Sequence, residues 1–163
     1  MCIRDRQMCR KKVKEAHIDT SLIYAYCKTS DYAKLEEFIS APNVGRIQDV
    51  AERCYSEAMY EAAKILFNSI SNFSRLATCL MHLGEHQAAV DAARKANSTR
   101  TWKEVNAACV EHKEFRLAQI CALHIIVNPD ELEELIASYE KFGHFDEVIS
   151  VCLLYTSDAA DDM

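Results

Sequence analysis

One short motif recurs along this chain of 163 residues: an aromatic ring, or an imidazole in its place, followed three positions later by a small or aliphatic residue. The five copies are Tyr32/Leu35, Tyr60/Ala63, His86/Ala89, Phe115/Ala118 and Phe145/Val148. Successive copies lie 28, 26, 29 and 30 residues apart. A period of this length is typical of a repeat array in which each unit is a helical hairpin that needs a neighbour to bury its apolar face.

A second series of positions keeps the same period. Helical patterns begin near Thr20, Arg46, Asn72, Arg100 and Asp130, at spacings of 26, 26, 28 and 30 residues. The chain has only 3 Gly and 2 Pro, too few for the tight turns of an all-β fold, and 50% of its residues are hydrophobic. The sequence therefore predicts an all-α fold, an α-solenoid of about five stacked helical hairpins with a period of 26–30 residues.

Local signals support several helix boundaries. Asn72 is a suitable N-cap, and Leu83-Gly84-Glu85 is a suitable turn between two helices. Pro129 precedes a run of carboxylates, Asp130 to Glu134, which the positive end of a helix dipole favours. We interpret this acidic cluster as the first turn of a helix, which needs no metal to explain it.

The eight cysteines do not predict a disulfide framework. Their gaps are 7, 18, 27, 25, 30, 12 and 31 residues, with no C-x-x-C pair. Cys27, Cys54, Cys79, Cys109 and Cys121 all fall within apolar helical patterns, so we expect reduced thiols in the core of an intracellular protein. The sequence contains no run of about 18 apolar residues, so it predicts no membrane span.

The formal net charge of −6 argues against a nucleic-acid partner, because binding to phosphates needs a basic face. One local exception surrounds the single tryptophan. Arg94, Lys95, Arg100 and Lys103 flank Trp102 at a predicted helix-loop-helix corner. We predict these five residues as a partner-binding site; the alternative is a solvated loop with Trp102 buried between hairpins. Charges at such a corner would mainly steer association.

The residues give little support to an enzyme or a metal protein. Three C-x-x-H pairs, Cys79/His82, Cys109/His112 and Cys121/His124, each place a thiol and an imidazole on one helical face. A structural zinc ion needs four convergent ligands, and these pairs lie on separate helices. No oxyanion-stabilising glycine turn accompanies them, and phosphate-binding glycine loops are absent from the sequence. We therefore predict no catalytic residue, no metal and no cofactor.

Specific segments resemble the clathrin heavy-chain family. They are DAARKANSTRTWKEV (91–105), RIQDVAERCY (46–55), MYEAAKILF (59–67), SNFSRLA (71–77), EFRLAQIC (114–121) and DELEELI (130–136). The resemblance is colinear from about Met8 to Ser150. It implies a segment of the proximal leg, built from clathrin heavy-chain repeats.

The resemblance also implies a function. Clathrin heavy chains form three-legged assemblies whose legs pack into polyhedral lattices around budding vesicles, and the proximal leg carries light chains. We therefore expect a non-enzymatic structural component of the clathrin coat, acting in endocytosis and vesicle-mediated transport at the cytoplasmic face of coated pits and vesicles. The expected partners are the clathrin light chain and other heavy chains, with membrane contact only indirect, through adaptors.

The ends of the sequence differ from its middle. Residues 1–7 and the acidic residues 155–163 lack apolar periodicity, and MCIRDR and YTSDAADD resemble translated sequencing-adaptor remnants. We expect both ends to be disordered or artefactual, residues 8–154 to form the repeat, and the chain to be a fragment of a longer reading frame. Two alternatives stay open, a stand-alone helical-repeat adaptor that binds peptides or partner helices, and a thiol or zinc enzyme.

Overall fold

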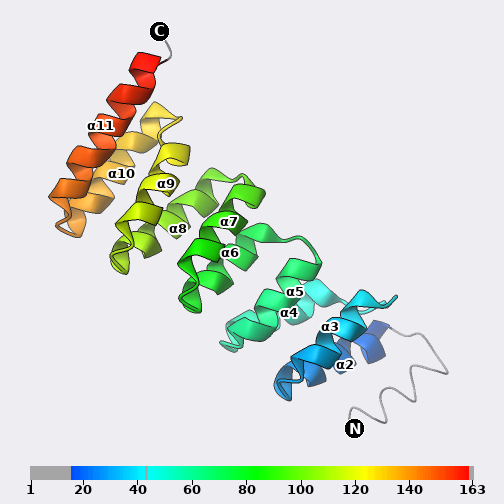
Figure 1. Ribbon diagram of the computed structural model, residues 1–163. Helices are drawn as coiled ribbons and strands as arrows, with labels where there is room; N and C mark the ends of the chain where they lie inside the picture. Colours follow the sequence, from blue (N-terminus) through cyan, green and yellow to red (C-terminus); the bar gives the residue numbers. More distant parts are fainter. Residues whose placement is uncertain (1–15, 43, 162–163) are drawn as a thin grey trace. The chain divides into compact units, whose positions relative to one another are not determined.

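The computed structural model describes residues 16–42 and 44–161, and within these ranges every regular element is an α-helix (Figure 1). The all-α, helical-repeat fold class is therefore confirmed. The chain divides into two compact units, one ending at Leu83 and the other beginning at Gly84. The first unit contains α2 (Ala16–Lys28), α3 (Tyr32–Ser40), α4 (Ile47–Ser56), α5 (Tyr60–Ser69) and α6 (Phe73–His82). The second contains α7 (His86–Ala96), α8 (Thr99–Glu111), α9 (Phe115–Ile125), α10 (Pro129–Lys141) and α11 (Phe145–Asp161).

The described helices alternate along the chain as the first and second helices of five pairs, as the period predicts; the third pair, α6 and α7, is divided between the two units. Each of the five ring positions of the motif is the first residue of the second helix of a pair, in α3, α5, α7, α9 and α11. Four of the five predicted first-helix starts agree within a residue; the exception is α2, which begins at Ala16 instead of Thr20. Residues 1–7 lie outside the described residues. Because α11 continues to Asp161, the limits 8–154 for the repeat stay a prediction.

A left-handed residue forms the turn inside each pair. It lies two positions before the ring, at Ser30, Ala58, Gly84, Lys113 and Gly143, with φ between 56° and 77°. In the second unit, the N–H of Glu114 donates to the carbonyl of Cys109 at 2.7 Å, and that of Lys113 donates to the carbonyl of Val110 at 3.1 Å. These are the two bonds of a Schellman motif, which satisfies the last carbonyls of the first helix and starts the second.

The rings of the motif also contact the next pair. Tyr60, at the start of α5, stacks on His82 at the end of α6, with ring centroids 4.4 Å apart and planes at 8°. In the second unit, Phe115 meets His144 edge to face at 4.9 Å. Offset and edge-to-face contacts of this kind add to the free energy of burial. The recurring ring therefore joins one helix pair to the following one.

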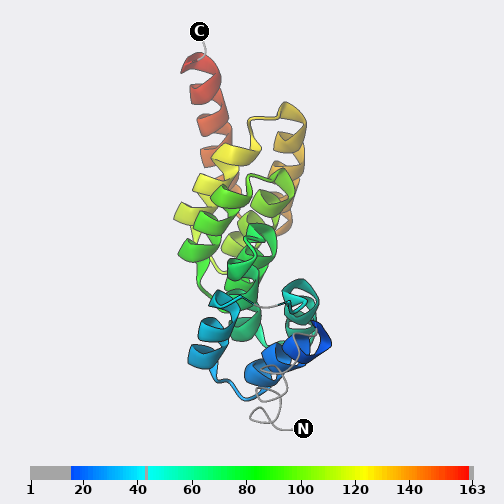
Figure 2. The same cartoon turned by 90° about the vertical axis from the view of Figure 1, so that its right-hand side faces the viewer.

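Small and aliphatic side chains fill the core of each unit. Ala62, Ala63, Leu66 and Phe67 of α5 are all fully buried, which lets this helix approach its neighbours closely. The five helical cysteines named from the sequence are free thiols and are buried, so their predicted place in the core is confirmed. In the second unit α8 and α9 lie side by side in both views (Figures 1 and 2), and α9 also contacts α7, α10 and α11.

Polar contacts fix the spacing of neighbouring pairs in the first unit. Glu57, after the end of α4, accepts a 2.9 Å hydrogen bond from Tyr24 Oη and a 2.6 Å ion pair from Lys28 Nζ, both on α2. Arg53 stacks its guanidinium 3.8 Å from the centroid of the Tyr24 ring and also binds Glu57. The hydrogen bonds from Lys28, Tyr24 and Arg53 lower the pKa of Glu57 to about 2, so this carboxylate stays ionised well into the acid range.

The segment between the first two pairs is held against α2. Asp19, buried in the first turn of α2, accepts a hydrogen bond from the N–H of Val44, and Thr20 Oγ1 accepts one from the N–H of Arg46, each at 2.9 Å. Gly45 lies between them because a Cβ there would approach Ile23 Cδ1 to 2.7 Å. Residues 44–46 are therefore held against the first turns of α2.

Replacing Lys113 with glycine should stabilise the second unit. Lys113 has φ 61°, and a residue with a Cβ pays about 1 kcal/mol or more in that region, which glycine avoids. We expect the free energy of unfolding of Lys113→Gly to rise by about 1 kcal/mol, measured by urea denaturation with the fluorescence of the single tryptophan, Trp102. Lys113→Ala is the matched control, since it removes the charge and keeps the Cβ. An equal gain in both variants would contradict the backbone explanation.

Candidate functional site

The predicted corner joins α7 to α8. Asn97 ends α7 in the left-handed conformation, with φ 49° and ψ 43°, and Ser98 is extended before α8 begins at Thr99. Arg94 and Lys95 occupy the last turn of α7, where positive charge is favoured by the helix dipole. The helix dipole alone therefore favours basic side chains at this corner, whether or not they also bind a partner.

The structure places the five predicted residues in three different environments. Arg94, Lys95 and Arg100 are exposed at the corner, and we call these three residues the basic corner. Trp102 is 4% exposed and stacks on His124 of α9, with centroids 4.1 Å apart and planes at 5°. Trp102 therefore packs against the second helix of its own pair. It supports the corner from the core and presents almost no surface to a partner protein. Lys103 points to α10.

Two of the exposed cations make ion pairs along their own helices. Arg94 lies 3.5 Å from Asp91, and Arg100 Nε lies 3.1 Å from Glu104. The Arg100 side chain nevertheless stays 89% exposed. Exposed pairs of this spacing contribute only a few tenths of a kcal/mol, so they leave these guanidinium groups available to a partner.

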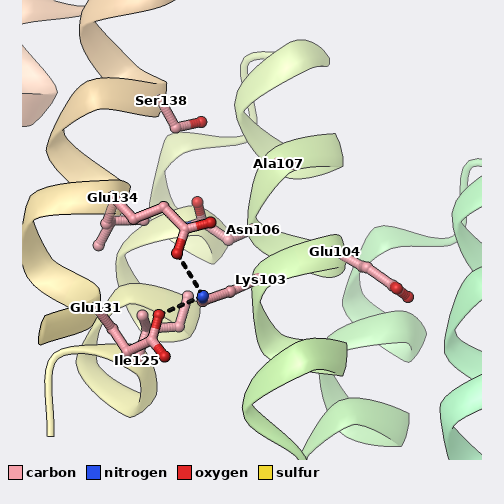
Figure 3. Close-up of a pocket in the computed structure, with 9 residues that line it drawn as sticks. Lys103, Glu104, Asn106, Ala107, Ile125, Glu131, Glu134 and Ser138 are labelled. Carbon is pink, nitrogen blue, oxygen red and sulfur yellow. Dashed lines mark hydrogen bonds and ion pairs between the residues drawn. The ribbon is translucent and has the colours of Figure 1, made fainter. Parts of the chain in front are cut away.

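Lys103 bridges two helix pairs. Its ammonium pairs with Glu131 and, at 2.6 Å, with Glu134, both on α10 (Figure 3). The carboxylates of Glu131 and Glu134 raise the pKa of Lys103, and Lys103 in turn lowers the pKa of Glu134. The lysine is therefore a charged strut between α8 and α10 as well as part of the surface.

A cavity of about 270 Å³ lies beside this strut, and we call it the acidic groove (Figure 3). Its lining residues come from α8, α9 and α10. They are Lys103, Glu104, Asn106, Ala107, Ile125, Glu131, Glu134, Leu135 and Ser138. One lysine and three glutamates leave these residues with a net charge of −2. Ile125 and Leu135 are buried and give the groove an apolar floor below a charged rim.

A buried polar contact supports the groove. Asn106, 2% exposed in the interior of α8, donates from Nδ2 to the carbonyl of Ala118 and to Tyr139 Oη, each at 2.9 Å. Burial raises the pKa of Tyr139 to about 12, against a smaller lowering by the Asn106 hydrogen bond. The tyrosine is therefore neutral at any physiological pH. Asn106 joins α8, α9 and α10 at one point.

Sequence reasoning missed these cross-helix contacts. It interpreted Asp130 to Glu134 through the helix dipole alone, whereas Glu131 and Glu134 also bind Lys103. It did not single out Asn106 or Tyr139. One signal was present: Asn106 is a polar residue on the apolar stripe of Trp102, Val105, Cys109 and Val110.

The described part of the chain offers little for metal or thiol chemistry. No group of three or more histidine, cysteine or acidic side chains there could hold a metal ion. The thiols of Cys79, Cys109 and Cys121 are fully buried, and burial raises the pKa of Cys79 to about 12. Among the same residues, no helix is long and apolar enough to cross a bilayer.

A family model described as "Region in Clathrin and VPS" matches residues 5–117. Over 145 residues the chain is 61% identical to a clathrin heavy chain of Dictyostelium discoideum, covering 89% of this chain and 9% of that protein. It is 58% identical over 149 residues to the clathrin heavy chain of Drosophila melanogaster, covering 91% and 9%. The chain belongs to the clathrin heavy-chain family. The resemblance found in the sequence is thereby confirmed.

Human clathrin heavy chain 2 gives a similar result, with 58% identity over 143 residues, or 88% of this chain and 9% of that protein. The chain thus spans about a tenth of the length of the clathrin heavy chains that it matches. The basic corner and the acidic groove both lie in this family segment.

Removing the Tyr139 hydroxyl should weaken the second unit. In Tyr139→Phe, Asn106 Nδ2 keeps the Ala118 carbonyl but loses one partner in a buried site, which typically costs about 1 kcal/mol or more. The measurement is urea denaturation followed by Trp102 fluorescence. Tyr155→Phe, at a half-buried site on α11, is the matched control and should change little. Equal stability of Tyr139→Phe and the unaltered chain would show that this contact does not support the groove.

Proposed function

We propose that this chain is a structural segment of a clathrin coat, a leg element that packs against other legs and light chains in a lattice for endocytosis and vesicle-mediated transport. The single observation that carries the proposal is the colinear match of about nine-tenths of the chain to clathrin heavy chains at 49–61% identity across animals, plants, yeast and an amoeba.

The fold suits a mechanical role. Helix pairs that pack within a unit and are joined by contacts such as Lys103 with Glu131 keep a fixed geometry and leave polar sides exposed. Such sides offer many weak contacts, and many copies in a lattice turn weak contacts into a stable but reversible assembly. No bond-making step is required of any residue. In this role the chain would work at the cytoplasmic face of coated pits and vesicles, and reach membranes only through adaptors.

The basic corner is our candidate for contacts with a leg or a light chain. Arg94 and Lys95 lie in the last turn of α7 and Arg100 lies in the first turn of α8, and all three are exposed. Trp102 stacks on His124, and Lys103 pairs with α10. A reversal of charge at Arg94 or Arg100 that left both kinds of binding unchanged would remove this candidate.

A segment replacement tests the coat function. The matching 145 residues of the Dictyostelium heavy chain are replaced by those of this chain, and the purified hybrid is tested for assembly into cages by electron microscopy. At 61% identity we expect cages and, in cells that lack their own heavy chain, restored uptake through coated pits. The control is a hybrid whose replaced segment carries Leu135→Asp, a buried charge that should unfold the segment. A folded hybrid that forms no cages would contradict the proposal.

A further inference from the structure

The basic corner and the acidic groove lie on one side of α8. Arg100, Lys103, Glu104 and Ala107 are spaced i, i+3, i+4 and i+7, so they form a single stripe of that helix. The last three of these residues line the groove, and the first belongs to the basic corner. The ion pair between Arg100 and Glu104 marks the boundary between the two patches. Two patches of opposite sign therefore adjoin on one face of the second unit.

We propose that this face is self-complementary, and that it docks a second copy of this chain with the basic corner of each copy against the acidic groove of the other. An isologous contact of this kind needs two complementary patches side by side on the same surface, because a two-fold axis then brings each patch onto its opposite. The inference rests on the proposed function in one respect, since neighbouring legs would supply the second copy.

The groove has the chemistry to receive an arginine. Glu134 pairs with Lys103 through Oε2, and its side chain is 70% exposed, so its carboxylate can accept further hydrogen bonds from an incoming guanidinium. Ile125 and Leu135 form an apolar floor against which the methylene stem of that arginine can pack. The lining residues carry a net charge of −2 with Lys103 already counted.

The basic corner has the matching donors. The Arg94 side chain is 57% exposed, and that of Arg100 is 89% exposed although its Nε reaches Glu104. Arg94 precedes and Arg100 follows the left-handed residue Asn97, at which α7 ends. The positive side chains at this corner are complementary in charge to the negative groove of about 270 Å³.

Such a contact should be weak and sensitive to salt. Exposed charges are screened within a Debye length, which falls from about 30 Å at 0.01 M salt to about 10 Å at 0.1 M. The self-association of one isolated pair is therefore expected only at low ionic strength and high concentration. In an assembly of many copies the same contact is repeated, and its effect grows by avidity.

Charge exchange tests the contact in the 163-residue chain. Sedimentation velocity at low salt measures self-association of the unaltered chain, of Arg94→Glu and of Glu134→Lys. Each single variant should weaken association by about tenfold or more, because both symmetric contacts become repulsive. An equimolar mixture of the two variants should restore it, because each contact in the mixed pair again joins opposite charges.

The control is Arg116→Glu, an exposed arginine of α9 outside both patches, which should associate like the unaltered chain. Circular dichroism and melting temperature establish that each variant folds. If Glu134→Lys does not fold, Glu131→Lys, at a second glutamate of the groove, replaces it in both the single-variant and the mixture measurements. A chain that stays monomeric at low salt, single variants that associate normally, or a mixture that fails to recover would each overturn the proposal. If Arg94→Glu lost light-chain binding while the unaltered chain did not self-associate, the proposal would also be overturned, and this face would instead dock a light chain.

The segment-replaced heavy chain separates this inference from the proposed function. If the hybrid forms cages and the hybrid with Arg94→Glu forms none, both stand. If both hybrids form cages equally well, the docking inference fails and the coat function stands. If the unaltered hybrid folds but forms no cages, the coat function fails whatever the isolated chain does in the centrifuge.

Discussion

The burial of helices against their neighbours within each unit is the constraint on which the rest of this structure depends. A helix of 9 to 13 residues is marginal by itself in water, and most helices here have this length. Their stability comes from apolar faces that are covered only when another pair packs against them. In the second unit α9 illustrates this, because it contacts α7, α8, α10 and α11 and buries Leu117, Ala118 and Cys121 among them.

The polar contacts act on top of this packing by fixing how the pairs meet. Arg75 of α6 binds Glu52 of α4 through two nitrogens, at 3.1 and 2.9 Å, and Asn106 of α8 reaches the α9 backbone and Tyr139. A partly exposed ion pair such as that of Arg75 with Glu52 contributes little to the net free energy of folding, and the buried Asn106 contact contributes more. Both have fixed lengths and directions. The proposed coat function would depend on such fixed geometry more than on high stability, because the surfaces of a coat segment have to meet those of its partners in register.

The sequence was a good guide to the elements and a poor guide to the contacts between them. The ring motif located the start of α3, α5, α7, α9 and α11, because a large side chain is needed where one pair meets the next. The turns were only partly visible: glycine marks them at Gly84 and Gly143, whereas Ser30, Ala58 and Lys113 adopt the same conformation without it. The pairing of Lys103 with α10 depends on helix spacing, which no local pattern contains. The predicted corner was found, but the burial of Trp102 and the groove beside Lys103 required the three-dimensional structure.

Amide hydrogen exchange would test most directly whether the helix pairs depend on one another. In Val105→Ala a fully buried side chain of α8 is shortened, leaving a small cavity. If the pairs share their stability, protection should fall in α7, α9 and α10 as well as in α8, because these helices contact it. A loss of protection confined to α8, with its neighbours exchanging as before, would contradict the account.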